Sequence, residues 1–241
     1  MNDKATRVVI LTTQTPHHAY FVREIGARRP DVMVLAETRT ATPPFPTFHP
    51  FEAERDDYER AAWFAGADPL LKDLAETESF ESLNDDRAVR RLAALRPDLA
   101  IVYGTGRLSP AVIAACPDGM INLHGGDPEE YRGLDTHLWA IYHGDFEGLV
   151  TTLHRVAPDL DSGDIVGHQP IALARGTKLH QLRRLNTEVG VGLVEKALAD
   201  FWNGTLKSTP QARKGRYYSF MPDVLKNVCV AKFQKHTDKL R

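Results

Sequence analysis

The chain has 241 residues, a formal net charge of −2, and apolar and charged contents of 42% and 26%. This length allows one sizeable core with at most a small appendage, in a globular protein. The charge argues against a broad nucleic-acid-binding surface, and no stretch has the pattern of a signal peptide or a membrane span. Cys116 and Cys229 are far apart and lack metal-ligand spacing. We therefore expect a cytoplasmic protein without metal, nucleic-acid or membrane partners.

The N-terminal part alternates strand, helix and strand. Arg7–Leu11 is an apolar run typical of a buried strand, and Pro16 is placed to begin a helix that ends near Arg28. Val32–Ala36 predicts a second strand. Polar residues lie where the first strand meets its helix, which is a common substrate or anion site, although cap and turn roles suit them equally. These residues are Thr13, Gln14, His17 and His18.

Residues 38–80 carry the weakest pattern. Thr42–Pro50 is a loop rich in proline and aromatic residues, and Phe51–Phe64 has the mixed composition of an amphipathic helix. We interpret this region as an insertion that could cover the substrate side of a site.

The next segment returns to a regular alternation. Asn84 or Asp85 can cap a helix that Pro97 stops, and Leu99–Val102 then predicts a strand. That strand leads into a glycine-containing loop, and Ser109-Pro110 begins a short helix after it.

The stretch from Gly119 to Ile165 is the centre of the chain. Met120–Leu123 predicts a strand on which Asn122 and His124 project from the same face. A double glycine follows and lets backbone approach a ligand closely. Thr136 is placed to cap a helix that Gly144 ends, and a second strand over Leu149–Val156 leads to a turn with Asp161. An amide, an imidazole and a carboxylate would thus meet where α/β sheets bind ligands.

These three groups suit acyl transfer to an amine. The Asn122 amide can donate to an oxyanion, His124 can move a proton, and Asp161 can orient His124 or accept the proton itself. Taken alone, His124 could equally be a structural histidine, and Asp161 an ordinary turn residue.

The alternation of strands and helices predicts an α/β fold, Rossmann-like, with a mainly parallel sheet flanked by helices. Thr177–Trp202 predicts one long helix closed by Gly204. Its expected buried stripe is Leu179, Leu182, Leu185, Val189, Leu193 and Leu198.

The order of several landmarks resembles the catalytic core of the folate-dependent formyltransferases. They are Asn122-Leu123-His124, Tyr131-Arg132-Gly133, a helix with Trp139, a strand from Thr151 to His154, and Asp161-Ser162-Gly163. Upstream, the loop from Tyr103 to Pro110 resembles the family loop that holds the pterin. That family includes glycinamide ribonucleotide transformylase, methionyl-tRNA formyltransferase and sugar-nucleotide N-formyltransferases. The resemblance covers residues 85–205 well, the first strand and helix loosely, and 38–80 not at all.

The resemblance implies N10-formyltetrahydrofolate as co-substrate and a primary amine as acceptor. It implies catalysis by Asn122 and protonated His124, which stabilise the oxyanion, with Asp161 as proton partner. The implied pterin contacts are Gly104, Thr105, Gly106, Arg107, Leu108, Asp159 and Gly163. One departure is the acidic loop Gly125-Gly126-Asp127-Pro128-Glu129-Glu130, which replaces the usual Pro-Ser-Leu-Leu-Pro and puts the amine specificity in doubt.

The tail adds three cations and two aromatic rings in Arg213-Lys214-Gly215-Arg216-Tyr217-Tyr218. They could hold a nucleotide-bearing substrate, or form a solvated turn and an edge strand. We expect a catalytic domain over residues 1–205 and a C-terminal extension over 206–241, which is too short for a tRNA-contacting domain and could pair two copies as a homodimer. A helix is expected over Asp223–Phe233. The expected acceptor contacts are Thr13, Gln14, His17, Gly125, Gly126, Arg132, Arg216, Tyr217 and Tyr218.

A nucleotide-linked amino sugar is therefore the expected acceptor. Glycinamide ribonucleotide is the alternative, because Gly133-Leu134-Asp135-Thr136-His137 resembles the purine-pathway enzyme. Hydroxyornithine-type amines, hydrolysis of the formyl-folate, and a non-catalytic folate-binding protein on the same fold remain open.

Overall fold

A seven-stranded sheet runs through the molecule in the order β3-β2-β1-β4-β5-β7-β8. The computed structural model describes residues 8–117 and 119–241, so the predicted Arg7 lies outside the described residues. The first five strands are parallel, while β7 is antiparallel to both of its neighbours. The strands are β1 (Val8–Thr13), β2 (Met33–Glu37), β3 (Glu76–Phe80), β4 (Leu99–Tyr103), β5 (Met120–His124), β7 (Val150–Arg155) and β8 (Ile165–Pro170).

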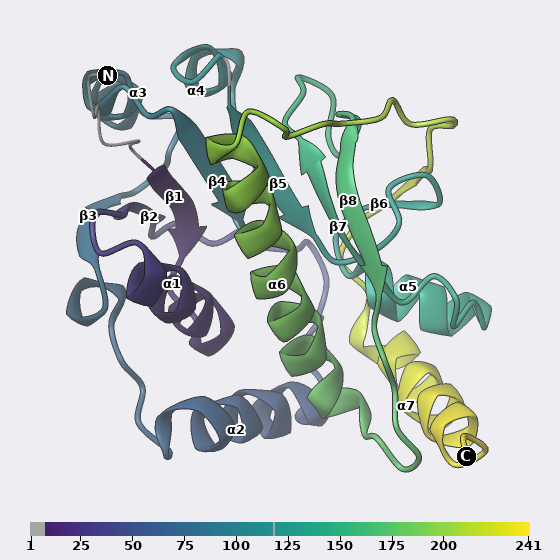
Figure 1. The fold of residues 1–241 in the computed structure, drawn as a ribbon. Helices are drawn as coiled ribbons and strands as arrows, with labels where there is room; N and C mark the ends of the chain where they lie inside the picture. The colour runs from purple at the N-terminus through teal and green to yellow at the C-terminus, as the bar shows by residue number, and fades with distance from the viewer. Residues whose placement is uncertain (1–7, 118) are drawn as a thin grey trace.

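Helices cover both faces of this sheet (Figure 1). Side chains alternate along β1, so that Val8 and Ile10 pack with α1 (Pro16–Arg28) and α6 (Leu182–Trp202). Val9 and Leu11 point the other way, into the core that α3 (Asp86–Leu95) and α4 (Pro110–Ala114) close. The expected mainly parallel α/β fold is confirmed.

The C-terminal part builds a third core beside the sheet. A small parallel pair joins β6 (Tyr131–Gly133) to β9 (Arg216–Tyr218). Next to it α7 (Asp223–Thr237) packs against α5 (Thr136–His143) and the 3-10 turn η2 (Leu179–Gln181). The buried Phe233, Ile141 and Tyr131 belong to this core. The remaining elements are α2 (Pro50–Phe64) and the 3-10 turn η1 (Leu71–Asp73).

Three expectations about local structure are wrong. Residues 38–80 are more than an insertion, because they contain β3, which pairs with β2 and forms an edge of the sheet. The polar sequence of β3, ETESF, lacks the apolar pattern that predicts a strand. The N-cap of α5 is Asp135, and the Thr136 hydroxyl instead donates to the Gly125 carbonyl. The buried stripe of α6 runs through Asn186, Thr187, Gly190, Val191, Val194 and Ala197, besides Leu182 and Leu198.

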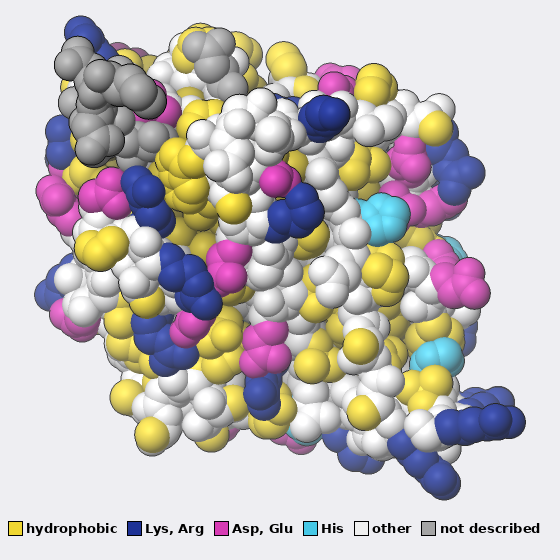
Figure 2. All heavy atoms as spheres, viewed as in Figure 1, with side chains coloured by type: hydrophobic (Ala, Val, Ile, Leu, Met, Phe, Trp, Pro, Cys, Tyr) yellow, Lys and Arg dark blue, Asp and Glu magenta, His cyan; other side chains and the backbone are white. Residues whose placement is uncertain are grey.

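The surface carries both signs of charge. On the face that α6 crosses, basic and acidic side chains are interspersed, and basic side chains gather near the C-terminal end of α7 (Figure 2). Among the described helices, none is long and apolar enough to cross a membrane.

Candidate active site

Asn122 and His124 come from the carboxyl end of β5. Between them Leu123 packs on Gly190 of α6, where an added Cβ would lie 2.5 Å from a Leu123 methyl carbon. Because side chains alternate along a strand, Asn122 and His124 point to the opposite face. His124 is buried, and its Nε2 lies 2.9 Å from the Tyr131 carbonyl oxygen, to which it donates.

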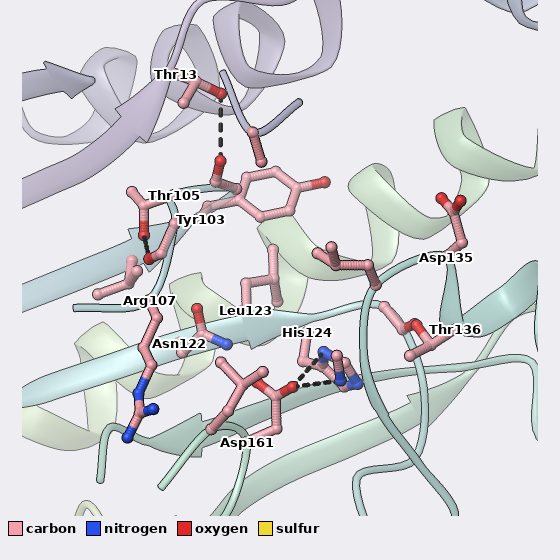
Figure 3. Close-up of a pocket in the computed structure, with 18 of the residues that line it drawn as sticks. Thr13, Tyr103, Thr105, Arg107, Asn122, Leu123, His124, Asp135, Thr136 and Asp161 are labelled. Carbon is pink, nitrogen blue, oxygen red and sulfur yellow. Dashed lines mark hydrogen bonds and ion pairs between the residues drawn. The ribbon is translucent and has the colours of Figure 1, made fainter. Parts of the chain in front are cut away.

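Asp161 reaches the same place from the turn that follows β7. It adopts a left-handed conformation with φ 49°, and its Oδ2 accepts a 2.8 Å hydrogen bond from the Gly133 backbone N–H. Oδ2 lies 3.7 Å from His124 Nδ1, and Oδ1 lies 3.5 Å from His154 Nε2. Figure 3 shows the carboxylate between Asn122 and His124. The three residues singled out from the sequence therefore do meet.

Burial and charge act in opposite directions on these groups. Burial raises the pKa of Asp161, but the interactions with His124, His154 and the Gly133 N–H outweigh it and bring the pKa to about 2. Burial lowers the pKa of His124 more than Asp161 raises it. These directions favour an ionised Asp161 beside a neutral His124 at neutral pH, whereas the family resemblance implies a protonated His124 in the reaction.

His154 is a fourth member of this group that the sequence did not single out as a site residue. In the antiparallel pairing of β5 with β7 it lies directly opposite Asn122. Its Nε2 is 3.1 Å from Asn122 Nδ2, and its Nδ1 donates to the Arg155 carbonyl over 2.7 Å. The register of the two strands is the signal that would have found it, and an isolated histidine in a strand does not reveal a register.

A cavity of about 840 Å³ surrounds these groups. Many of the predicted site residues line it: Thr13, His17, Gly104, Thr105, Gly106, Arg107, Leu108, Asn122, His124, Gly125, Asp161 and Tyr217. Part of its wall comes from α2, within the region 38–80 that we interpreted as covering the substrate side, whereas the walls on α6 and around Asp135 were not predicted.

The loop from Gly104 to Leu108 is held in place by a buried carboxylate. Glu37 Oε2 accepts a 2.9 Å hydrogen bond from Gly106 N–H, while Oε1 accepts from Ser82 and Leu83. Gly104 has φ 77°, and a Cβ there would lie 2.1 Å from His18 Nε2. Both the conformation and the space therefore require glycine.

Seven predicted contacts do not line the cavity. Three of them support it from behind: Gln14 bonds to Pro69 and Leu71, Arg132 donates to the Leu160 carbonyl beside Asp161, and Gly163 packs against the Arg155 carbonyl. The others are Gly126, Asp159, Arg216 and Tyr218. Asp159 is exposed and pairs with Lys214, while Tyr218 packs on Trp139.

Among the described residues, no group of three or more His, Cys, Asp or Glu side chains is placed to hold a metal ion.

A mainly parallel α/β sheet, with a cavity at the carboxyl ends of its strands, is the architecture of a Rossmann-like small-molecule enzyme. The family model described as formyl transferase matches residues 7–195, and the chain belongs to this family.

The curated relatives are longer proteins. The chain is 31% identical over 143 residues to the methionyl-tRNA formyltransferase of Koribacter versatilis, which covers 59% of this chain and 46% of that protein. It is 30% identical over 132 residues to the methionyl-tRNA formyltransferase of Halalkalibacterium halodurans, and this match covers 54% of this chain and 41% of that protein. The chain thus spans about half the length of the curated relatives that it matches.

Solved structures share the fold at low identity. A sugar N-formyltransferase from Shewanella sp. FDAARGOS_354 superposes with a TM-score of 0.64 at 12% identity, covering 94% of this chain and 87% of that chain. PseJ from Anoxybacillus kamchatkensis was solved in complex with UDP-4,6-dideoxy-4-formamido-L-AltNAc and tetrahydrofolate. It superposes with a TM-score of 0.56 at 15% identity, covering 88% of this chain and 85% of that chain. HypX from Aquifex aeolicus, in complex with tetrahydrofolic acid, superposes with a TM-score of 0.57 at 20% identity, covering 91% of this chain and 30% of that chain.

Proposed function

We propose that this protein transfers the formyl group of N10-formyltetrahydrofolate to a primary amine. The observation that carries the proposal is the meeting of Asn122, His124 and Asp161 in one cavity, with the Gly104–Leu108 loop along its wall. The loop would hold the pterin, and the opposite walls would hold the amine.

In the proposed reaction the amine nitrogen attacks the formyl carbon, and its lone pair forms the new C–N bond. The Asn122 amide donates to the oxyanion that develops, which is the role of a fixed hydrogen-bond donor in acyl transfer. Neutral His124 uses Nδ1 to take the proton from the amine, because its Nε2–H already donates to Tyr131. The resulting imidazolium faces ionised Asp161 and is stabilised by it. Collapse of the intermediate breaks the bond to N10, and His124 returns the proton to that nitrogen.

For the acceptor we propose the amino group of a nucleotide-linked sugar. Tyr217 supports this choice, since it lines the cavity with more than half of its surface exposed and can stack on a base. The PseJ complex, whose description names a UDP-linked formamido sugar, is consistent with this choice. Glycinamide ribonucleotide remains the alternative acceptor.

Residues 206–241 would complete the acceptor side. The support is that β9 pairs with β6, Met221 N–H donates to Asp135, and Tyr217 and Phe220 line the cavity. We propose this extension as a wall of the site and as a surface for pairing two copies. We also propose the cytoplasm as its compartment, because both cysteines of the chain, Cys116 and Cys229, are buried thiols.

The test is turnover of N10-formyltetrahydrofolate with nucleotide-linked 4-amino and 3-amino sugars, glycinamide ribonucleotide, and no amine. Release of tetrahydrofolate with one amino sugar alone would support both the reaction and the acceptor. Release without any amine would make the protein a hydrolase, and tight folate binding without release under every condition would favour a binding protein.

A further inference from the structure

A nucleotide-linked acceptor needs a binding site for its anionic group, and the basic cluster of the tail does not provide one. Arg213 pairs with Glu130, and Lys214 pairs with Asp159 over 2.9 Å. The Arg216 guanidinium lies 5.3 Å from the centre of the Tyr218 ring. None of these three cations lines the cavity. Arg213 and Lys214 therefore join the tail to other segments, while Arg216 contacts a ring of its own strand.

Besides Arg39 and Arg107, two further arginines line the cavity. They are Arg55 from α2 and Arg183 from the first turn of α6. The Nε of Arg55 lies 3.2 Å from Asp56 Oδ1, and the Nη2 of Arg183 lies 2.6 Å from the same oxygen. Because both guanidinium groups share one acceptor atom, they lie side by side on this wall.

Carboxylates of α2 fix the orientation of this arginine pair. Arg183 makes a bidentate contact with Glu59, whose side chain is fully buried, through Nε at 2.7 Å and Nη2 at 2.5 Å. Arg55 lies 3.6 Å from Glu52 through Nη1. The side chains therefore need little further ordering to bind a ligand.

One N–H edge of each guanidinium group makes no hydrogen bond with the described residues. Within the part of the chain that the structure describes, Nη2 of Arg55 and Nη1 of Arg183 donate no hydrogen bond. Burial lowers the pKa of Arg55, and the neighbouring Arg183 lowers it further. An oxyanion that accepts from both edges would relieve this unfavourable pairing of like charges.

The surroundings favour a directed contact over a general positive field. Three carboxylates of α2 (Glu52, Asp56 and Glu59) accompany Arg55, Arg183 and Lys226, and Asp135 lies within electrostatic reach of the same group, so the cluster carries no excess of positive charge. His17 on the adjoining wall is uncharged at neutral pH, since burial, His18 and the two arginines all lower its pKa. Recognition would thus depend on N–H donors aimed at oxygen atoms, as in binding of a carboxylate or a phosphate.

We propose that the acceptor amine carries an oxyanion group, a carboxylate or a phosphate, which the Arg55–Arg183 pair binds while the amine reaches His124 in the same cavity. This inference rests on the proposed function. It assigns the anion site to α2 and α6 instead of the tail, which was one of the two interpretations that the sequence left open.

The test measures anion binding without turnover, so that it is independent of the formyl-transfer reaction. Inorganic phosphate, pyrophosphate and acetate are titrated by calorimetry into the full chain at constant ionic strength. Arg55→Gln is the variant, because Arg183→Gln would leave buried Glu59 without its partner. Arg60→Gln is the matched control on the same helix, since Arg60 pairs with Asp57 and Asp68 outside the cavity. Arg216→Gln tests the tail.

The wild type is expected to bind at least one of these anions saturably. Arg55→Gln should weaken that binding about tenfold or more, as loss of a charge-assisted hydrogen bond predicts, while Arg60→Gln and Arg216→Gln bind as the wild type does. Preference for acetate over the phosphates would identify a carboxylate acceptor, and the reverse a phosphate. No anion binding by the wild type, equal binding by Arg55→Gln, or a loss confined to Arg216→Gln would overturn the inference. Tetrahydrofolate binding by each variant checks that it is folded, and its absence in the wild type would count against the proposed function instead.

Discussion

Replacement of Asp161 by asparagine separates the charge of this group from its shape. Asparagine resembles the protonated carboxyl group and can still accept from the Gly133 N–H. The pKa of Asp161 is brought from its ordinary 3.8 to about 2 by His124, His154 and that N–H, against the effect of burial. A shift of about two pKa units corresponds to roughly 2–3 kcal/mol of stability that depends on the negative charge.

Asp161→Asn should therefore lower the free energy of unfolding by about 2 kcal/mol where His124 is protonated, and by less at pH 7, where His124 is neutral. Because the folded-state pKa is the lower one, this stability is present above about pH 4 and is lost as the pH falls toward 2. Urea unfolding of both proteins from pH 8 to pH 4 measures the difference, which should grow as His124 becomes protonated and gains its attraction to Asp161. In the same preparations kcat should fall by about 10²–10⁴-fold, because the imidazolium of His124 loses its partner. Equal stability at pH 7 together with an unchanged kcat would refute this reasoning.

Gly104→Ala should destabilise the protein by about 1–3 kcal/mol more than Gly176→Ala, as measured by urea unfolding, since the two glycines have nearly the same φ but only Gly104 lies against another side chain. Equal losses would show that the contact with His18 relaxes freely. Glu37→Gln should raise the dissociation constant of tetrahydrofolate about tenfold and leave kcat little changed. The reason is that the amide NH₂ of glutamine would face one of the backbone N–H groups that now donate to Glu37. An effect on kcat alone would contradict this. Burial lowers the pKa of His18 to about 3 and of His137 to about 4, so their contribution to stability is complete above pH 6.5 and is lost as the pH falls toward these values. Unfolding free energies that do not change between pH 7.5 and pH 5 would argue against neutral buried histidines.

The sequence predicted most of what local pattern determines. The apolar runs of β1, β4 and β5, the proline at the start of α1 and the glycine after α5 correspond to elements of the structure. The family resemblance is confirmed by the matching family model. The roles of Asn122, His124 and Asp161 remain predictions, although the structure brings the three together.

The sequence could not show what depends on packing between distant segments. The polar strand β3 exists because it completes the edge of the sheet beside β2, and polar edge strands lack the alternation that reveals them. His154 belongs to the site through the register of β5 with β7. Arg55 and Arg183 are 128 positions apart, so only the packing of α2 near the start of α6 places them together.

The most direct test of the central claim is single-turnover formyl transfer by the wild type, Asn122→Ala and His124→Ala, with the tetrahydrofolate dissociation constant measured for each. We expect both variants to lose about a hundredfold or more in the rate of transfer, the usual cost of removing an oxyanion donor or a general base, and to keep folate affinity nearly intact. A variant that transfers the formyl group at the full rate would remove that residue from the mechanism.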